Sequence, residues 1–191
     1  MLPRFLAATF DLDALAKEES TLIAIDPSHK IRWVNPAWTR FALANGGDDV
    51  VQRFGTGSSY LDGTSGPARS FYEEALTRAA KTRTIFEHDY ECSSPETFRR
   101  FHLRALPCDD AGLLLEHSLV VEHPHDRVES EIGHEGYVRD NGFILQCSNC
   151  RRVRHKERSA WDWVPFLVRN VTAKTSHGLC AACEGFYWRV K

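Results

Sequence analysis

The sequence predicts an α+β fold, in which a five-stranded antiparallel sheet with flanking helices precedes a small four-cysteine metal-binding module. Three observations predict it: short strand-like runs joined by turn residues, helical periodicity between the second and third runs, and two Cys-x-x-Cys motifs near the C-terminus. The chain has 191 residues, 42% of them hydrophobic and 26% charged. It therefore has enough apolar residues for a globular core, and room for one domain plus a small module.

Charge divides the chain into two parts. Residues 147–191 contain nine Lys or Arg against three Asp or Glu, a net charge of +6, and the remainder contains 15 against 23, a net charge of -8. The basic part is either available to an acidic partner or simply a solvated face. No run approaches the roughly 18–20 apolar residues of a membrane helix, and residues 1–10 lack a signal-peptide cleavage pattern. We therefore expect a soluble, cytoplasmic protein without membrane contacts.

The first third of the chain predicts a helix, a hairpin and a second helix. Apolar residues recur at helical spacing over 3–17, so residues 1–20 should form an N-terminal helix that covers the sheet or pairs with a second subunit in a homodimer. The β-rich runs 21–25 and 31–34 flank a turn rich in Asp, Pro and Ser. Asn35 followed by Pro36 is typical of a helix start, and residues 45–47 should end that helix.

The middle of the chain predicts one long helix and three further strands. Residues 48–67 are rich in Gly, Ser, Thr and Asp, which favours loops and short helical turns. Residues 68–81 carry an apolar stripe at helical spacing. Strand-like runs then cover 84–92, 98–106 and 112–121, with turn residues between them.

Several short sequence segments within residues 21–122 resemble those of PAS domains. They are the opening Ile-Ala-Ile-Asp-Pro…Ile-Arg-Trp-Val-Asn-Pro-Ala-Trp over 23–38, the Ser-Tyr-Leu-Asp segment over 59–62, and the final strand over 114–121. The resemblance covers about half of the chain. It implies a five-stranded antiparallel sheet that cradles small molecules under a set of helices, and a sensory or interaction role rather than a reaction.

Two Cys-x-x-Cys motifs with 29 residues between them predict a metal site. Cys147 with Cys150, and Cys180 with Cys183, would supply the four thiolates that Zn²⁺ favours. A module of about 50 residues buries too little apolar surface to fold reliably without such a staple. Disulfides or redox motifs are the alternatives, disfavoured by a reducing cytoplasm and by the lack of an α/β context. The apolar residues around Trp161–Val168 should pack beside the cysteines in one small core.

The same four thiolates could hold iron in a rubredoxin-like redox centre. Arg151 and Glu184 follow the two motifs where rubredoxins usually have glycine, which disfavours iron. The segments 147–154 and 176–183 resemble a small cysteine module appended to some bacterial PAS and response-regulator proteins. That resemblance places a linker at 123–142 and the module at 143–191. His177 either contacts a thiolate from outside the ligand set, replaces a ligand, or is purely structural.

The PAS resemblance implies a pocket that holds haem, a flavin, an organic acid or nothing. The Asn-Cys-Arg phrase of flavin photoreceptors is absent from 35–80, and the 68–81 helix has no histidine for haem. Strand alternation puts two histidines among apolar neighbours, where each needs a hydrogen bond, a ligand or a metal unless it faces outward. The candidate pocket residues are His88, His117, Trp33, Phe71 and Tyr90.

No catalytic motif is present, so we expect no enzyme activity. The sequence favours a PAS-type sensory and signal-transduction protein whose zinc module acts as an adaptor for a signalling protein. Nucleic-acid binding by the basic module is a second hypothesis and an iron redox protein a third. The predicted partner contact is a basic strip: Arg151, Arg152, Arg154, Lys156 and Arg158.

Overall fold

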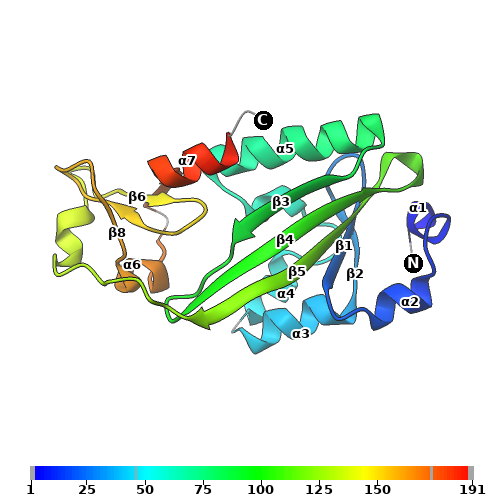
Figure 1. Cartoon of the computed structure of the whole chain (residues 1–191), viewed down its shortest axis with the longest axis horizontal. Coiled ribbons are helices and arrows are strands. Elements are labelled where there is room, and N and C mark those ends of the chain that lie inside the picture. The colour runs from blue at the N-terminus through cyan, green and yellow to red at the C-terminus, as the bar shows by residue number, and fades with distance from the viewer. Residues whose placement is uncertain (1–2, 46, 173, 189–191) are drawn as a thin grey trace. The chain divides into compact units, whose positions relative to one another are not determined.

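Figure 1 shows a computed structural model of the chain, which describes residues 3–45, 47–172 and 174–188. Its internal contacts group the chain into two compact units. The first contains residues 1–64, 72–89 and 101–119, and the second contains residues 65–71, 90–100 and 120–191. Gly46, part of the predicted helix stop, lies outside the described residues.

An antiparallel five-stranded sheet forms the framework of the first unit (Figure 1). Its strands are β1 (Thr21–Ile25), β2 (Ile31–Val34), β3 (Phe86–Glu91), β4 (Thr97–Pro107) and β5 (Leu113–Pro124). They lie in the order β2-β1-β5-β4-β3, so the last strand pairs with the first, as in Ile23 opposite Leu115. This confirms the α+β prediction and the PAS-type architecture that the resemblance implies.

Helices connect the two halves of this sheet. They are α3 (Pro36–Ala44), α4 (Asp48–Arg53), the 3₁₀ turn η1 (Tyr60–Gly63) and α5 (Gly66–Thr82), and a second 3₁₀ turn, η2 (Asp109–Ala111), precedes β5. In the first unit α5 buries Tyr72, Ala75, Leu76 and Ala79, which recur at helical spacing. The predicted helices and loops are therefore present, with ends shifted by a few residues.

The N-terminal segment forms two short helices, α1 (Arg4–Ala7) and α2 (Leu12–Lys17), where one helix was expected. The break occurs at Asp11, because its side chain accepts hydrogen bonds from the amides of Asp13 and Ala14 and starts a new helix. Phe5 and Leu6 of α1 pack on Leu22 and Ala24 of β1. The segment thus covers one face of the sheet, which is one of the two roles predicted for it.

Asn35 joins the start of α3 to the first strand, and its replacement is expected to be costly. The side chain is fully buried; its Oδ1 accepts from the amides of Leu22 and Trp38, both at 3.0 Å, and its Nδ2 donates to the Ser20 carbonyl at 2.9 Å. Asn35→Ala should lower the free energy of unfolding by about 3 kcal/mol, since it removes a helix cap and leaves buried groups unpaired. Chemical denaturation checks this. Asn45→Ala, at the exposed end of the same helix, should cost well under half as much, and equal costs would contradict the account.

The second unit contains a smaller sheet of four strands in the order β8-β7-β6-β9. Its elements are η3 (His134–Tyr137), β6 (Ile144–Cys147), β7 (Val153–Arg154), β8 (Trp161–Asp162), α6 (Pro165–Arg169), β9 (Thr175–Gly178) and α7 (Ala181–Tyr187). Pro165 occupies the first turn of α6, where its missing amide hydrogen costs nothing. The break predicted at this proline is thus a helix start.

Residues 123–142, expected as a polar linker, contribute to the core of the second unit. Tyr137 is fully buried and packs with Ile144, Val153, Val164 and Leu167. Its hydroxyl donates to the Asp162 carboxylate at 2.7 Å and also bonds to the Ser130 hydroxyl at 2.6 Å. Although this segment is polar in composition, one buried aromatic residue joins it to the sheet.

Among the described residues, no helix combines the length and the apolar character needed to cross a bilayer.

Candidate metal centre

The topology of the second sheet brings the two cysteine motifs together. Strands β6 and β9 are parallel neighbours in register, with Cys147 opposite Gly178. The first motif begins at Cys147, the last residue of β6, and the second follows β9, so both lie at the same end of the sheet. The Ser148 amide donates to the Gly178 carbonyl at 2.8 Å and fixes one motif on the strand that leads to the other. Two segments separated by 29 residues thereby present their cysteines to one point.

The four sulfur atoms form one closed cluster. Cys147, Cys150, Cys180 and Cys183 are all buried, with exposed fractions of 1%, 3%, 5% and 7%, and their sulfurs lie within 4.8 Å of one another. The sulfurs of Cys150 and Cys180 are 3.7 Å apart, far beyond the roughly 2.0 Å of a disulfide. A tetrahedral site with metal–sulfur bonds of about 2.3 Å has sulfur–sulfur distances of about 3.8 Å. The geometry therefore fits a metal ion and does not fit paired disulfides.

The pKa of each cysteine thiol in the cluster depends on the neighbouring thiols. Hydrogen bonding from the Cys150 thiol lowers the pKa of Cys147 to about 7, and bonds from Cys147 and Cys150 lower the pKa of Cys180. Hydrogen bonds to Cys147 and Cys180 raise the pKa of Cys150 and of Cys183, because each of these thiols keeps its proton to donate. Without a metal, loss of all four protons would set four thiolates in mutual repulsion. A divalent cation would remove that repulsion and let all four lose their protons, so the donor set suits a metal that prefers thiolates.

Arg151 shows that glycine is not required after the first motif. Its φ is +61°, in the left-handed region that glycine usually occupies at such a turn. Its guanidinium donates to the Ser93 carbonyl at 3.2 Å, and burial lowers its pKa. The missing glycine, which disfavoured iron in the sequence argument, therefore does not prevent the turn, and the choice of metal has to rest on other grounds.

Asn149, not His177, contacts a cluster sulfur from outside the ligand set. Its Nδ2 donates to the Cys183 sulfur at 3.3 Å, while its Oδ1 accepts from the Glu91 amide at 3.1 Å and the Tyr187 hydroxyl at 3.3 Å. His177 lies half-buried on β9 outside the four-residue metal cluster, and burial lowers its pKa. Only the position of Asn149 inside the first motif could have indicated its role.

A buried ion pair next to the first cysteine motif stabilises that motif. Arg127 and Glu91 each expose 9% of their side chains, and an Arg127 nitrogen lies 2.6 Å from a Glu91 oxygen. The second terminal nitrogen of Arg127 donates to the Cys150 carbonyl at 2.7 Å. The guanidinium also lies 4.9 Å from the centre of the Trp163 ring. No local pattern in the sequence indicates either charged residue, because their pairing joins positions 36 residues apart.

The apolar residues of the module divide between two clusters where one core was expected. Trp161 and Leu179 pack against the four cysteines, whereas Val164 and Leu167 pack against Tyr137. In β8 successive side chains point to opposite faces, so Trp161 and Asp162 face different neighbours.

The predicted basic strip does not form one exposed face. Arg151 is half-buried and bonded within the unit, and Arg152 and Arg154 are also half-buried. Lys156 and Arg158 are exposed. The two exposed residues are therefore those most accessible to a partner.

The five candidate pocket residues of the PAS half are divided between the two units. Trp33 packs with Leu22 and Ala24 on the face that α1 covers, because the register with β1 shifts and pairs Ala24 with Trp33 but Ile25 with Ile31. Phe71 and Tyr90 belong to the second unit, where Phe71 packs on Tyr187 and Trp188 of the C-terminal segment.

The two histidines remain in the first unit. The His88 ring stacks with Phe86 and meets the edge of Tyr72, and His117 is buried next to the Tyr60 ring. Burial lowers the pKa of each to about 4, with opposing effects at His88 from Asp89, which raises it, and His102, which lowers it. Both rings are therefore neutral at pH 7.

Acid should destabilise the fold through His117. Its folded pKa of about 4 lies below the ordinary histidine pKa of 6.5, so the unfolded state binds the proton more tightly and stability is lost as the pH falls below 6.5. Between pH 7 and pH 5 the loss should be about 2 kcal/mol for this residue. His117→Gln should remove that part of the loss, as measured by urea denaturation of both proteins at the two pH values. An equal loss in both would contradict the assignment.

Comparisons with known proteins concern the fold of the PAS half. No family model and no curated protein matches this sequence.

The chain is similar to solved structures that include a domain of an HTR-like protein from Haloarcula marismortui, with 17% identity over 55% of this chain and 100% of that one, and a TM-score of 0.40. The PAS domain of the RpfR quorum-sensing receptor from Cronobacter turicensis, in complex with C12:0, has 14% identity over 55% and 97%, and a TM-score of 0.42. The photoactive yellow protein domain of the sensor histidine kinase Ppr from Rhodospirillum centenum has 14% identity over 56% and 92%, and a TM-score of 0.40. The PAS-type architecture assigned above follows from the strand order of this chain.

Proposed function

We propose that this chain is a cytoplasmic sensory and signal-transduction protein in which a structural zinc ion holds a C-terminal module that binds another protein. The observation that carries the proposal is the convergence of four buried cysteine sulfurs from two motifs. Four thiolates complete a tetrahedral shell and leave no open position for a substrate, which is typical of structural rather than catalytic zinc. The PAS-type sheet supplies the sensory half, and we propose no catalytic output.

The metal content and the absorption spectrum of the purified protein distinguish zinc from iron. Elemental analysis of freshly purified protein should find one zinc per chain, and its absorption spectrum should show no visible bands. One iron per chain with visible charge-transfer bands would replace the structural role by an electron-transfer role. A Soret band in the same spectrum would reveal haem in the PAS half, which the proposal does not include.

The adaptor role is supported by charge and exposure in the basic strip. Lys156 and Arg158 are exposed and follow β7 directly, so the fold of the module fixes their position. A partner with an acidic surface would be attracted over a distance of about 10 Å at moderate salt. We propose a signalling protein as that partner.

Charge reversal tests the adaptor role. Lys156→Glu with Arg158→Glu should reduce partner cross-linking in cells by about tenfold, while Lys17→Glu with Lys81→Glu, exposed residues outside the strip, should leave it unchanged. Equal cross-linking in both variants would refute the strip as the contact. A salt-dependent gel shift with DNA, lost in the first variant alone, would assign the strip to nucleic acid instead.

We also propose a homodimer, since PAS-type modules resembling this one often pair. Light scattering at micromolar concentrations should give twice the chain mass of 21.7 kDa, and a mass equal to one chain would refute this part.

A further inference from the structure

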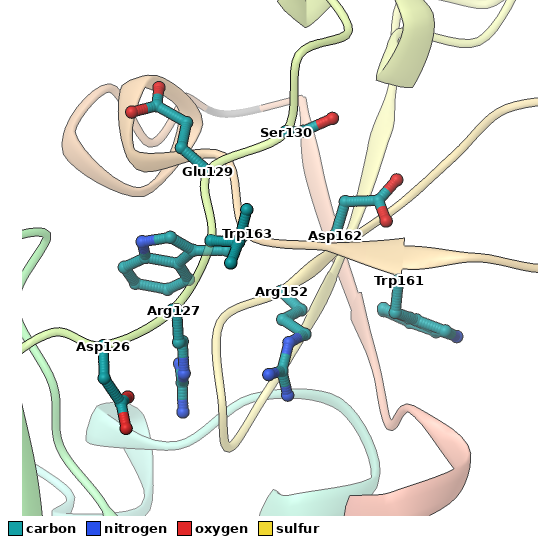
Figure 2. A pocket seen from close by; sticks show the side chains of 9 residues that line it. Asp126, Arg127, Glu129, Ser130, Arg152, Trp161, Asp162 and Trp163 are labelled. Atoms are coloured by element: carbon teal, nitrogen blue, oxygen red, sulfur yellow. The ribbon is translucent and has the colours of Figure 1, made fainter.

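A pocket lies beside the metal centre, within the second unit. It has a volume of about 520 Å³, within the range of small-molecule sites, and is lined by the segment 126–130, by Arg152 and by residues 161–163. Figure 2 shows the guanidinium groups of Arg127 and Arg152 pointing to the same side of the pocket, which Trp161 and Trp163 also line. The pocket thus combines two cations with flat aromatic surfaces.

Strand alternation explains this combination. In the antiparallel pair of β7 and β8, Val153 lies opposite Asp162 and Arg154 lies opposite Trp161. Val153 points into the core, so the arginines on either side of it share the other face with the two tryptophans. This shared face follows from the alternation in two segments, Arg-Arg-Val-Arg over 151–154 and Trp-Asp-Trp over 161–163.

The two guanidiniums differ in their partners. Arg127 is neutralised by Glu91 and bonded to the Cys150 carbonyl. Arg152 is half-buried and, among the described residues, its side chain makes no ion pair and no hydrogen bond with the protein. A half-buried arginine guanidinium in a pocket lined by aromatic rings is suited to bind a carboxylate through two parallel hydrogen bonds.

The acidic residues that line the pocket do not pair with Arg152. Figure 2 shows the carboxylates of Glu129 and Asp162 directed away from the guanidiniums, and Asp162 accepts from the Tyr137 hydroxyl. Asp126 points to the guanidinium side, but it is exposed and lies outside ion-pair distance of Arg152. Asp126 should therefore weaken the binding of an anion without blocking it.

We propose that this pocket binds a small planar carboxylic acid, with the carboxylate on Arg152 and the flat body against Trp161. This is a binding site beyond the proposed adaptor role, and it does not require a protein partner. The metal centre builds it, because the Cys147 amide donates to the Arg152 carbonyl at 2.8 Å and Trp161 packs on the cysteine cluster. Binding should therefore disappear when the metal is removed.

Calorimetric titration of the full-length, metal-loaded chain tests the proposal with 1-naphthoate as the probe and the neutral 1-naphthamide as its control. Naphthoate should bind saturably with one site, and at least about tenfold more tightly than the amide. Arg152→Gln should weaken naphthoate binding by about tenfold or more, and Arg152→Lys by less, because lysine keeps the charge but not the planar fork. Lys156→Gln, which removes one exposed charge outside the pocket lining, should change it less than twofold.

Removal of the Asp126 charge provides an independent check. Asp126→Asn should tighten naphthoate binding by about twofold to fivefold. Absence of saturable binding, equal binding of acid and amide, or no effect of Arg152→Gln would overturn the proposal. Binding of an acidic peptide such as tetraglutamate amide, without binding of naphthoate, would also overturn it. Since the double charge reversal at Lys156 and Arg158 leaves this pocket unchanged, failure of the adaptor role and failure of this site are distinguishable.

Discussion

Removal of the metal is expected to unfold the cysteine module. A structural zinc ion contributes on the order of 10–16 kcal/mol of apparent folding free energy, about as much as the whole stability of a typical domain. Treatment with EDTA should therefore shift the fluorescence of Trp161 and Trp163 toward that of solvated tryptophan and open residues 143–188 to proteolysis. Addition of zinc in excess should restore both properties.

Single cysteine variants make this test specific. Cys150→Ser should behave like the chelated protein, because three thiolates and a hydroxyl bind zinc much more weakly than four thiolates. Cys92→Ser changes an exposed cysteine outside the cluster and should keep the metal and the protease resistance. A module that stays protected in EDTA, or a Cys150→Ser protein as stable as the parent, would show that the metal does not hold the fold.

Loss of Arg127 should produce the second largest effect. Arg127→Met should lower the free energy of unfolding by about 3–5 kcal/mol, because it leaves the Glu91 carboxylate buried without its cation. It also removes the donor to the Cys150 carbonyl, so the first cysteine turn should bind metal less tightly. Urea denaturation of the metal-loaded proteins measures the stability, and competition with a chromophoric chelator measures the metal affinity.

The matched control for Arg127 is Arg169→Gln. Arg169 pairs with Glu96 in the same unit, but the two side chains are 58% and 63% exposed, so breaking that pair should cost less than about 1 kcal/mol. Glu91→Gln combined with Arg127→Met should recover part of the stability lost in the single variant, since no charge then remains buried. Equal costs for Arg127→Met and Arg169→Gln would contradict the buried ion pair.

The parts of the fold that sequence predicted correctly are those that local chemistry determines. The first hairpin has the predicted bounds, because Asp26 accepts from the amides of Ser28 and Lys30 and closes the turn without help from distant residues. Asn35 caps α3 for the same reason. The four cysteines also follow a local rule, since each motif places two sulfurs on one side of a turn.

The parts that sequence missed depend on residues distant in the chain. Period-two alternation cannot reveal the register shift that moves Trp33 to the covered face of the sheet. The roles of Arg127 and Asn149 depend on Glu91, which lies 36 and 58 residues away from them. Tyr137 lies in a segment of polar composition, so only its burial shows that the segment is not a linker.

X-ray absorption at the metal edge of the purified protein tests whether four cysteine sulfurs bind one zinc ion. We expect zinc with four sulfur neighbours at about 2.3 Å and no oxygen or nitrogen neighbour. A shell that contains nitrogen would place a histidine such as His177 among the ligands, and a metal-free protein with paired disulfides would contradict the metal centre altogether.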